Sequence, residues 1–428
     1  MMATPRTRTC SHEKNTDYVT RKSKRICIPI DPETYQQVLA DKAAFKAYLD
    51  QQIAAFPELF PATIAQGYTL QGFVPPSAKM PEVRMRRIAI PTSNGGPAVR
   101  FTVAPSFVLP YMTGYTYDVE AGLFLCKFDV PPWALARVFG RDAMYWERLA
   151  LHFGYNSVVG TTVKDPEALP AHLLADEKHT WVNGEKAYVA TTVGAECVLG
   201  ASVTLSADTP GLQEGYSHFK VEAQDLQPDY TPATVNIDGW DATQAAWLNL
   251  FALVTIIRCF LHAFLKIRDC GKRLKAQFTE VCTRVWECYR APDQDTFLAR
   301  VQTLQTWATE HLPPGAAVEA VLKLCAKAPL LAQAYDHPGA YRTSNMLDRH
   351  MNPMDRSFDR TQYFHGHLMT AEYRVRAWAL LHNFLPYGPR TGNTNPYQSP
   401  AHQLNGRVYH EDWLQNLLIS ASMGGWRQ

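Results

Sequence analysis

The chain has 428 residues, 46% of them hydrophobic, and a formal net charge of +2. This length allows two or three domains with sizeable cores, and the balanced charge excludes a strongly basic chain, so any nucleic-acid surface must be local. No apolar run reaches the roughly 18 residues that a membrane span needs. Nucleotide-binding glycine loops and a G-x-S-x-G elbow are absent, which excludes ATPases, Rossmann dehydrogenases and serine hydrolases.

Nine cysteines are scattered without a C-x-x-C pair. This pattern favours a reducing compartment over a zinc ribbon or a disulfide framework, so we expect a soluble intracellular protein. Residues 1–25 are polar, basic and aperiodic, and we expect a flexible tail that either binds phosphates or is simply solvated. Its basic residues are Arg6, Arg8, Lys14, Arg21, Lys22, Lys24 and Arg25.

Residues 31–56 repeat apolar positions at helical spacing behind an aspartate cap and a proline, which predicts a helix. Two alternating runs, MPEVRMRRIAI and PAVRFTVA, flank Asn94-Gly95-Gly96 and predict a β-hairpin. Its arginines either face DNA or belong to an ordinary solvated strand face. They are Arg84, Arg86, Arg87 and Arg100.

Residues 131–153 predict two short helices, PPWALARVFG and RDAMYWERLALHFG, joined by a tight glycine turn. This arrangement is typical of a helix-turn-helix, which places its second helix in the major groove of DNA. An ordinary helical hairpin gives the same pattern. In the first interpretation Arg141, Tyr145, Arg148 and His152 are exposed and available to DNA.

The middle of the chain is rich in strand patterns. LLADEKHTWV and EKAYVATTVG flank the two-residue turn Asn183-Gly184, and CVLGASVTLS follows as a third strand. A helix near 211–226, the strand 232–238, a second helix and a strand near 253–259 come next. Three antiparallel strands followed by helix, strand, helix and strand form the ribonuclease H-like arrangement, in which the first and fourth strands are neighbours.

Asp238 closes the strand PATVNID and is followed by Gly239. A carboxylate at the end of a buried strand is costly unless it is paired or binds a metal ion. In the expected fold, Asp176 of the first strand would meet Asp238 at one edge of the sheet. Two magnesium ions roughly 4 Å apart can promote phosphodiester cleavage and strand transfer. Two aspartates alone provide few ligands for two such ions, so a third acid is needed.

A third acid is expected beyond an all-helical insertion at residues 280–335. Our choice is Asp348, on a helix that Ser344 or Asn345 can cap. Asp355 lies seven residues further along the same helical face, and Glu372 is a second alternative. A solvated helix face is the other interpretation of all three acids.

Three blocks of the sequence resemble the catalytic motifs of DDE-type transposases, closest to the Mutator-like group and related bacterial insertion-sequence transposases. The blocks are ADEKHT, then NIDGW with a C-x-x-H pair at Cys259 and His262, and finally TSNMLDR. In that group the second acid sits in a D-G pair, and the third falls in a T-[ST]-N-x-x-[ED]-R motif. The resemblance covers roughly residues 170–385. This chain has Asp348 where the family more often has Glu.

The resemblance implies a DDE/DDD-type transposase that binds terminal inverted repeats and catalyses metal-dependent DNA cleavage and strand transfer. Asp176, Asp238 and Asp348 would bind two Mg²⁺ or Mn²⁺ ions, and Arg349 would contact DNA. His262 would act near the scissile phosphate or hold the strand to the following helix. Zinc binding by Cys259 and His262 is a weaker alternative, because no second ligand pair lies at a plausible spacing.

The expected fold class is therefore α/β, with a ribonuclease H-like catalytic domain at residues 166–279 and 336–385 around the helical insertion. Residues 26–165 would form an α+β DNA-binding region containing the helix-turn-helix, and residues 386–428 a C-terminal tail. Expected partners are double-stranded DNA and further copies of the chain, in a nucleoid-associated cytoplasmic setting. Two rival hypotheses are a transposase-derived DNA-binding protein that no longer cuts and a ribonuclease H-like nuclease of repair or RNA processing.

Overall fold

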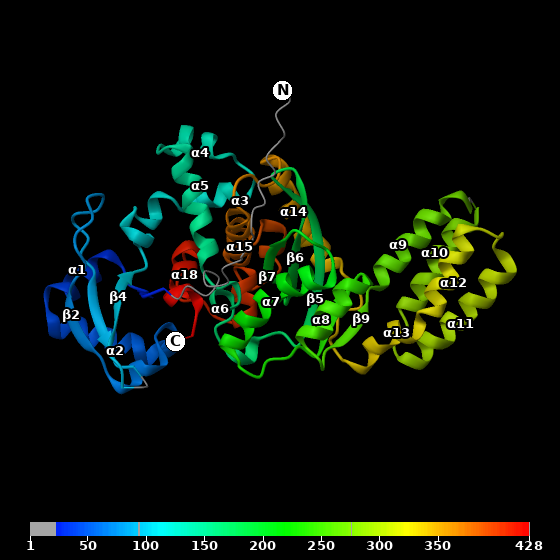
Figure 1. Ribbon diagram of the computed structural model, residues 1–428, viewed down its shortest axis with the longest axis horizontal. Helices are drawn as coiled ribbons and strands as arrows, with labels where there is room; N and C mark the ends of the chain where they lie inside the picture. The colour runs from blue at the N-terminus through cyan, green and yellow to red at the C-terminus, as the bar shows by residue number, and fades with distance from the viewer. Residues whose placement is uncertain (1–22, 93–94, 275, 428) are drawn as a thin grey trace, which may run out of the picture.

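The computed structural model describes residues 23–92, 95–274 and 276–427. The chain is a mixed α/β protein with two mixed β-sheets, many helices and a mostly helical C-terminal half. Figure 1 shows a four-stranded sheet at one end, a five-stranded sheet in the centre and a group of helices at the other end. Across the described ranges, no helix is long and apolar enough to cross a membrane.

The first sheet has the strand order β1-β4-β3-β2. Its strands are β1 (Arg25–Ile28), β2 (Thr69–Phe73), β3 (Arg86–Ile90) and β4 (Val99–Pro105). β3 and β4 form the predicted antiparallel pair, and β1 joins β4 in parallel. Part of the predicted turn between β3 and β4, residues 93–94, lies outside the described residues.

Two helices replace the single one predicted over residues 31–56. They are α1 (Pro32–Ala40) and α2 (Lys42–Ala55). Asp41 separates them, because its extended backbone ends α1 and its carboxylate accepts from the first N–H groups of α2. The predicted tail lies mostly outside the described residues, but Arg25 does not belong to it. Its guanidinium donates to the Val108 carbonyl oxygen at 2.7 Å at the start of β1.

The central sheet has the strand order β7-β6-β5-β8-β9. Its strands are β5 (His172–Val182), β6 (Glu185–Gly194), β7 (Cys197–Thr204), β8 (Thr234–Ile237) and β9 (Thr255–Arg258). The first three are antiparallel, whereas β8 and β9 run parallel to β5. Asn183 and Gly184 both have positive φ, 52° and 82°, as the predicted two-residue hairpin turn requires. The expectation that the first and fourth strands are neighbours is confirmed by the pairing of β5 with β8.

Helices cover the central sheet on both sides. The helix α7 (Thr209–Leu226) and the helix α8 (Asp241–Leu250) pack together around Tyr216, Phe219 and Trp247, all fully buried. The other main helices of the sheet region are α14 (Asn345–Arg360) and α15 (Leu368–Phe384). α15 buries Trp378, Leu381 and Phe384.

The inserted helices have a hydrophobic core of their own and stand apart from the sheets (Figure 1). They are α9 (Phe260–Gly271), α10 (Ala276–Tyr289), α11 (Gln294–His311), α12 (Ala316–Ala326) and α13 (Ala328–Ala332). This group begins directly after β9 rather than near residue 280, because Phe264 and Ile267 of α9 already belong to its core. The predicted start of the insertion was therefore wrong.

The C-terminal residues do not form the tail predicted over residues 386–428. They include α17 (Pro400–Asn405) and α18 (Trp413–Ser420). Leu414 and Leu417 of α18 are fully buried in the largest core. The prediction was wrong because α18 packs its apolar face against segments that are distant in sequence.

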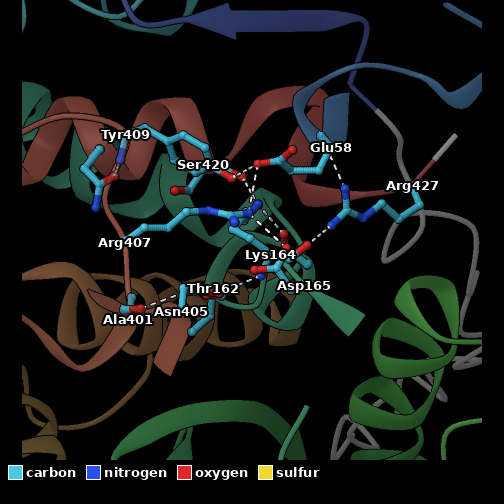
Figure 2. A network of polar contacts seen from close by, with 12 residues as sticks. Glu58, Thr162, Lys164, Asp165, Ala401, Asn405, Arg407, Tyr409, Ser420 and Arg427 are labelled. Carbon is cyan, nitrogen blue, oxygen red and sulfur yellow. Dashed lines mark hydrogen bonds and ion pairs between the residues drawn. The ribbon is translucent and has the colours of Figure 1, made fainter. Parts of the chain in front are cut away.

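Figure 2 shows the polar network that fixes this C-terminal segment. The buried Lys164 ammonium donates to the carbonyl oxygens of Gly160 and Ser420 at 2.6 and 2.5 Å. Arg407 lies 3.1 Å from the Glu58 carboxylate and 2.9 Å from that of Asp165. The network therefore joins the N-terminal region, the centre and the C-terminus into one body.

Candidate functional site

Asp176 and Asp238 lie at the same level on neighbouring strands. In the parallel pair of β5 and β8, Leu174 is opposite Asn236. Asp176 and Asp238 each stand two residues beyond that pair, so their side chains project from one face of the sheet. Asp176 is half-buried, whereas Asp238 is exposed and accepts a hydrogen bond from Trp240 N–H at 2.7 Å.

Asp348 approaches this face from the first turn of α14. The Asn236 side-chain amide donates to the Tyr341 carbonyl oxygen at 2.9 Å, which holds the segment before α14 against the sheet. Ser344 Oγ then donates to Asp348 Oδ2 at 3.1 Å. Ser344 is the N-cap residue of α14, as predicted, but its side chain makes no cap hydrogen bond, because its hydroxyl donates to this carboxylate instead.

Cys259 connects the end of the sheet to α14. Its backbone N–H donates to the Ile237 carbonyl oxygen at 2.8 Å, beside Asp238. Its sulfur accepts from Ser344 N–H at 3.2 Å and lies 3.4 Å from Ser344 Oγ. A continuous chain of contacts therefore runs from β8 through Cys259 and Ser344 to Asp348.

Electrostatic interactions link the three aspartates and His262. Burial, together with the nearby Asp238 and Asp348 carboxylates, raises the pKa of Asp176 to about 6. The contact with Cys259 and the charges of Asp176 and Asp238 raise the pKa of His262 to about 9, against the effect of burial. The Nδ1 atom of His262 is buried and has no hydrogen-bond partner in the described residues. His262 therefore lies close enough to Asp176 and Asp238 for their charges to favour its protonated form.

Glu177 is adjacent to Asp176 in sequence but belongs to the opposite face of the sheet. The hydroxyls of Tyr216 and Thr243 both donate to its Oε1 at 2.7 Å. Burial raises the pKa of Glu177 to about 7. Sequence reasoning missed this carboxyl group, although its place in a strand next to Asp176 was a signal that it faces the helices behind the sheet.

The two alternative third acids have partners elsewhere. Asp355 forms an ion pair with Lys178, which lies two residues beyond Asp176 on β5. Glu372 is buried at the outer strand β7, where it accepts from Val203 N–H at 2.6 Å and lies 3.0 Å from His218 Nδ1. Asp348 is therefore the best-placed of the three acids to act with Asp176 and Asp238.

A glycine follows Asp238 because the backbone and a neighbouring side chain both require it. Gly239 has φ 110°, and a Cβ atom there would lie 2.9 Å from Arg258 Nη1. The Arg258 guanidinium also contacts Gln244 and lies 3.5 Å from the Asp241 carboxylate. Sequence reasoning missed Arg258, which adds a positive charge next to the second acid.

The predicted helical hairpin is present as α4 (Pro132–Phe139) and α5 (Ala143–His152). Gly140 and Arg141 form its turn with φ values of 74° and 63°. Arg141 and Arg148 are exposed, as a DNA-contacting role requires.

The other two predicted contacts of this hairpin are less available. His152 is not exposed, because it lies between Tyr111 and Tyr155 with ring centroids 4.8 and 4.9 Å away. Burial and the Arg25 charge lower the pKa of His152 to about 4. Tyr145 is half-buried beneath the Arg141 guanidinium, 5.4 Å from its ring centroid. A role of His152 in binding phosphates is thus unsupported.

The arginines of β3, and Arg84 just before this strand, also take part in packing. Arg86 is buried, with its guanidinium 4.4 Å from the Phe73 ring centroid and 5.3 Å from that of Phe45. The prediction that Arg86 faces DNA was therefore wrong. Arg84 is exposed but stacks on Phe73 at 3.9 Å, and Arg87 is half-buried.

Arg349 follows Asp348 directly and is exposed, with its guanidinium 3.0 Å from the Glu196 carboxylate. No group of three or more His, Cys, Asp or Glu side chains in the described residues has the arrangement of a metal site. Asp176, Asp238 and Asp348 carry the oxygen ligands that hard cations prefer, and the charges of Asp238 and Asp348 contribute, after burial, to the raised pKa of Asp176.

No protein-family model matches the chain, and no curated protein is significantly similar to it.

Proposed function

We propose that the chain is a DDE-type transposase of a DNA insertion element. The observation that carries the proposal is the approach of Asp176, Asp238 and Asp348 to one another from β5, the end of β8 and the start of α14. The strand order of the central sheet, with its helical insertion between β9 and α14, supports a ribonuclease H-like catalytic domain.

In this proposal Asp176, Asp238 and Asp348 would hold two magnesium or manganese ions. Such ions, when bound, supply the Lewis acidity that activates an attacking oxygen and stabilises a leaving one. The contact from Ser344 keeps the Asp348 carboxylate turned toward the sheet. The His262 imidazolium, near Asp176 and Asp238, offers a positive charge to a DNA phosphate at the same place.

DNA would be held by the exposed guanidinium groups outside this site. Arg141 and Arg148 on the helical hairpin are exposed, whereas Arg86 is buried against Phe45 and Phe73. Their binding to phosphates would be salt-sensitive and would position the terminal inverted repeats. Because transposition brings two DNA ends together, further copies of the chain are expected partners.

A second candidate is a transposase-derived protein that binds DNA without cutting it. One observation favours it: no metal-site arrangement of three ligating side chains occurs in the described parts of the chain. The shorter Asp348, in place of the family's usual Glu, is consistent with the same interpretation. The two candidates share every DNA-binding feature and differ in cleavage.

The deciding experiment measures cleavage and joining of DNA that carries the element's own ends, with Mg²⁺, for the parent chain and Asp238→Asn. We expect the parent to cut and join, and the variant to lose at least roughly a thousandfold in rate while binding the ends equally well. Asp241→Asn is the matched control. Asp241 is the first residue of α8, follows Asp238 closely in sequence, and has a side chain that is 98% exposed.

Three other outcomes would redirect the proposal. If parent and variant bind the ends equally and neither cuts, the non-cutting candidate replaces the transposase. If the parent cuts DNA or RNA without requiring the ends and never joins strands, the chain is a nuclease. If Asp238→Asn retains full cleavage, the assigned carboxylates are wrong.

A further inference from the structure

Arginines and aromatic rings alternate along one side of α5, in the helical hairpin that projects from the central sheet in Figure 1. Arg148 and His152 are four residues apart on α5, and Tyr155 follows three residues later, in a 3-10 turn that continues the helix. Spacings of four and three residues place these side chains on one face. Tyr145, three residues before Arg148, extends this face to the Arg141 guanidinium, which lies over the Tyr145 ring.

Tyr111 joins this face from another segment of the chain. Its ring meets the His152 ring edge to face with centroids 4.8 Å apart, and the Tyr155 ring contacts the same imidazole at 4.9 Å. Tyr111 nevertheless stays 77% exposed and Tyr155 44% exposed. Tyr111 also has φ 61°, a left-handed conformation that bulky residues rarely adopt, so the chain holds this ring in solvent in spite of backbone strain. Together Arg141, Arg148, His152, Tyr155 and Tyr111 form the α5 stripe.

The charges of the α5 stripe favour an anionic partner. Arg141 and Arg148 are exposed, and neither has an ion-pair partner among the described residues. The two acids of the same helix and its turn are already in use. Asp142 accepts from a backbone N–H as the cap of α5, and Glu147 forms an ion pair with Arg374. The stripe therefore presents unpaired positive charge next to exposed aromatic rings.

We propose that the α5 stripe binds single-stranded DNA. Phosphates would lie against Arg141 and Arg148, and unpaired bases would stack on Tyr111 and Tyr155. Exposed rings favour a single strand, because neighbouring base pairs cover the flat faces of the bases in a duplex. The inference rests on the proposed function for the choice of DNA over RNA, and it adds unpaired strands to the double-stranded ends considered above.

The test measures binding of a fluorescently labelled oligothymidylate of about 12 nucleotides to the whole chain by fluorescence anisotropy, without divalent metal. We expect the parent to bind this strand at least about fivefold more tightly than the duplex of oligothymidylate and oligoadenylate of equal length. Tyr111→Ala should weaken single-strand binding at least about fivefold, whereas Tyr111→Phe keeps the ring and should bind like the parent. Tyr117→Ala is the matched control, because Tyr117 is 66% exposed but lies beside the Asp118 and Glu82 carboxylates, which repel phosphates.

A second variant tests the arginines of the stripe. Arg148→Gln should weaken single-strand binding and reduce the slope of log Kd against log salt concentration by about 0.7, whereas Lys42→Gln, at an exposed lysine of α2, should change neither. Absence of single-strand binding, equal or tighter binding of the duplex, or unchanged affinity in Tyr111→Ala or Arg148→Gln would overturn the proposal. Tighter binding of oligouridylate would assign the stripe to RNA and overturn it as well. None of these outcomes measures cleavage, which the comparison with Asp238→Asn tests separately.

Discussion

Carboxylates in and beside the central sheet lie in two regions, and the side chains that surround them carry opposite charges. At the junction of α7 and α15, the buried Glu222 forms an ion pair with Arg376, and Glu372 pairs with His218. At the junction of β5, β8 and α14, Asp176 instead faces the carboxylates of Asp238 and Asp348. The first region neutralises its acids with cations from the chain, whereas the second gathers acids around one imidazole.

The difference is visible in how the two regions ionise. Burial opposes ionisation of Glu372, but the contacts with His218, Arg376 and Val203 N–H outweigh it, so the pKa of Glu372 lies below its ordinary value. The pKa of Asp176 lies above its ordinary value, because burial and like charges act together. Paired acids stabilise the fold, whereas a group of unpaired acids costs stability and is typical of a functional site.

The largest expected effect on stability comes from breaking a pair. Glu222→Gln leaves the buried Arg376 guanidinium without its counter-charge, although Ser157 and Val159 can still donate to the remaining side-chain oxygen. We expect the free energy of unfolding to fall by roughly 3–5 kcal/mol, measured by urea denaturation. Glu319→Gln, at an exposed helix position, should change it by less than about 0.5 kcal/mol. A loss below about 1 kcal/mol for Glu222→Gln would contradict this account of the paired region.

In the unpaired region, removing a carboxylate should raise the free energy of unfolding rather than lower it, and the size of this gain should depend on pH. A folded-state pKa of about 6 for Asp176, above the ordinary 3.8, means that the folded chain binds this proton more tightly than the unfolded chain. Titration of Asp176 should therefore lower the stability of the parent by roughly 3 kcal/mol as pH rises from about 4 to about 6. Asp176→Asn removes this loss, so the variant should match the parent near pH 4 and exceed it above pH 7.

Urea denaturation of both proteins with a metal chelator, at several pH values between 4 and 8, measures this difference. A stability gap that stays constant across the range would show that Asp176 does not titrate as described. The same variant should lose DNA cleavage, so that stability and activity change in opposite directions.

Much of the central sheet could be predicted from local patterns. Asn183-Gly184 fixes the register of β5 against β6, and the alternation of β5 places Asp176 and Glu177 on opposite faces. What the local patterns missed depends on distant segments. Arg86 is buried because Phe45 and Phe73 cover it, and the burial of His152 depends on Tyr111.

In the candidate site too, some positions could be predicted from local patterns and others depend on distant segments. The position of Asp238 beside Asp176 follows from two parallel strands and could be predicted from their order. Cys259 and Ser344, which lead on to Asp348, are 85 residues apart in sequence, most of them in the inserted helices, so no local pattern indicates this link. The partners of Asp355 and Glu372 likewise come from other elements, and they separate these acids from Asp348.

This link gives the smallest of the expected effects. Ser344→Ala removes the hydroxyl that donates to Asp348 but keeps the backbone N–H that donates to Cys259. With the third acid less well oriented, we expect kcat for DNA cleavage to fall about tenfold with KM unchanged. Ser344→Thr keeps a hydroxyl and should recover most of the rate, whereas Thr303→Ala, on the exposed face of α11, should have no effect. If Ser344→Ala instead raised KM at constant kcat, or if Ser344→Thr were equally impaired, the hydroxyl would have no role in orienting Asp348, and the two carboxylate regions would differ only in their charges.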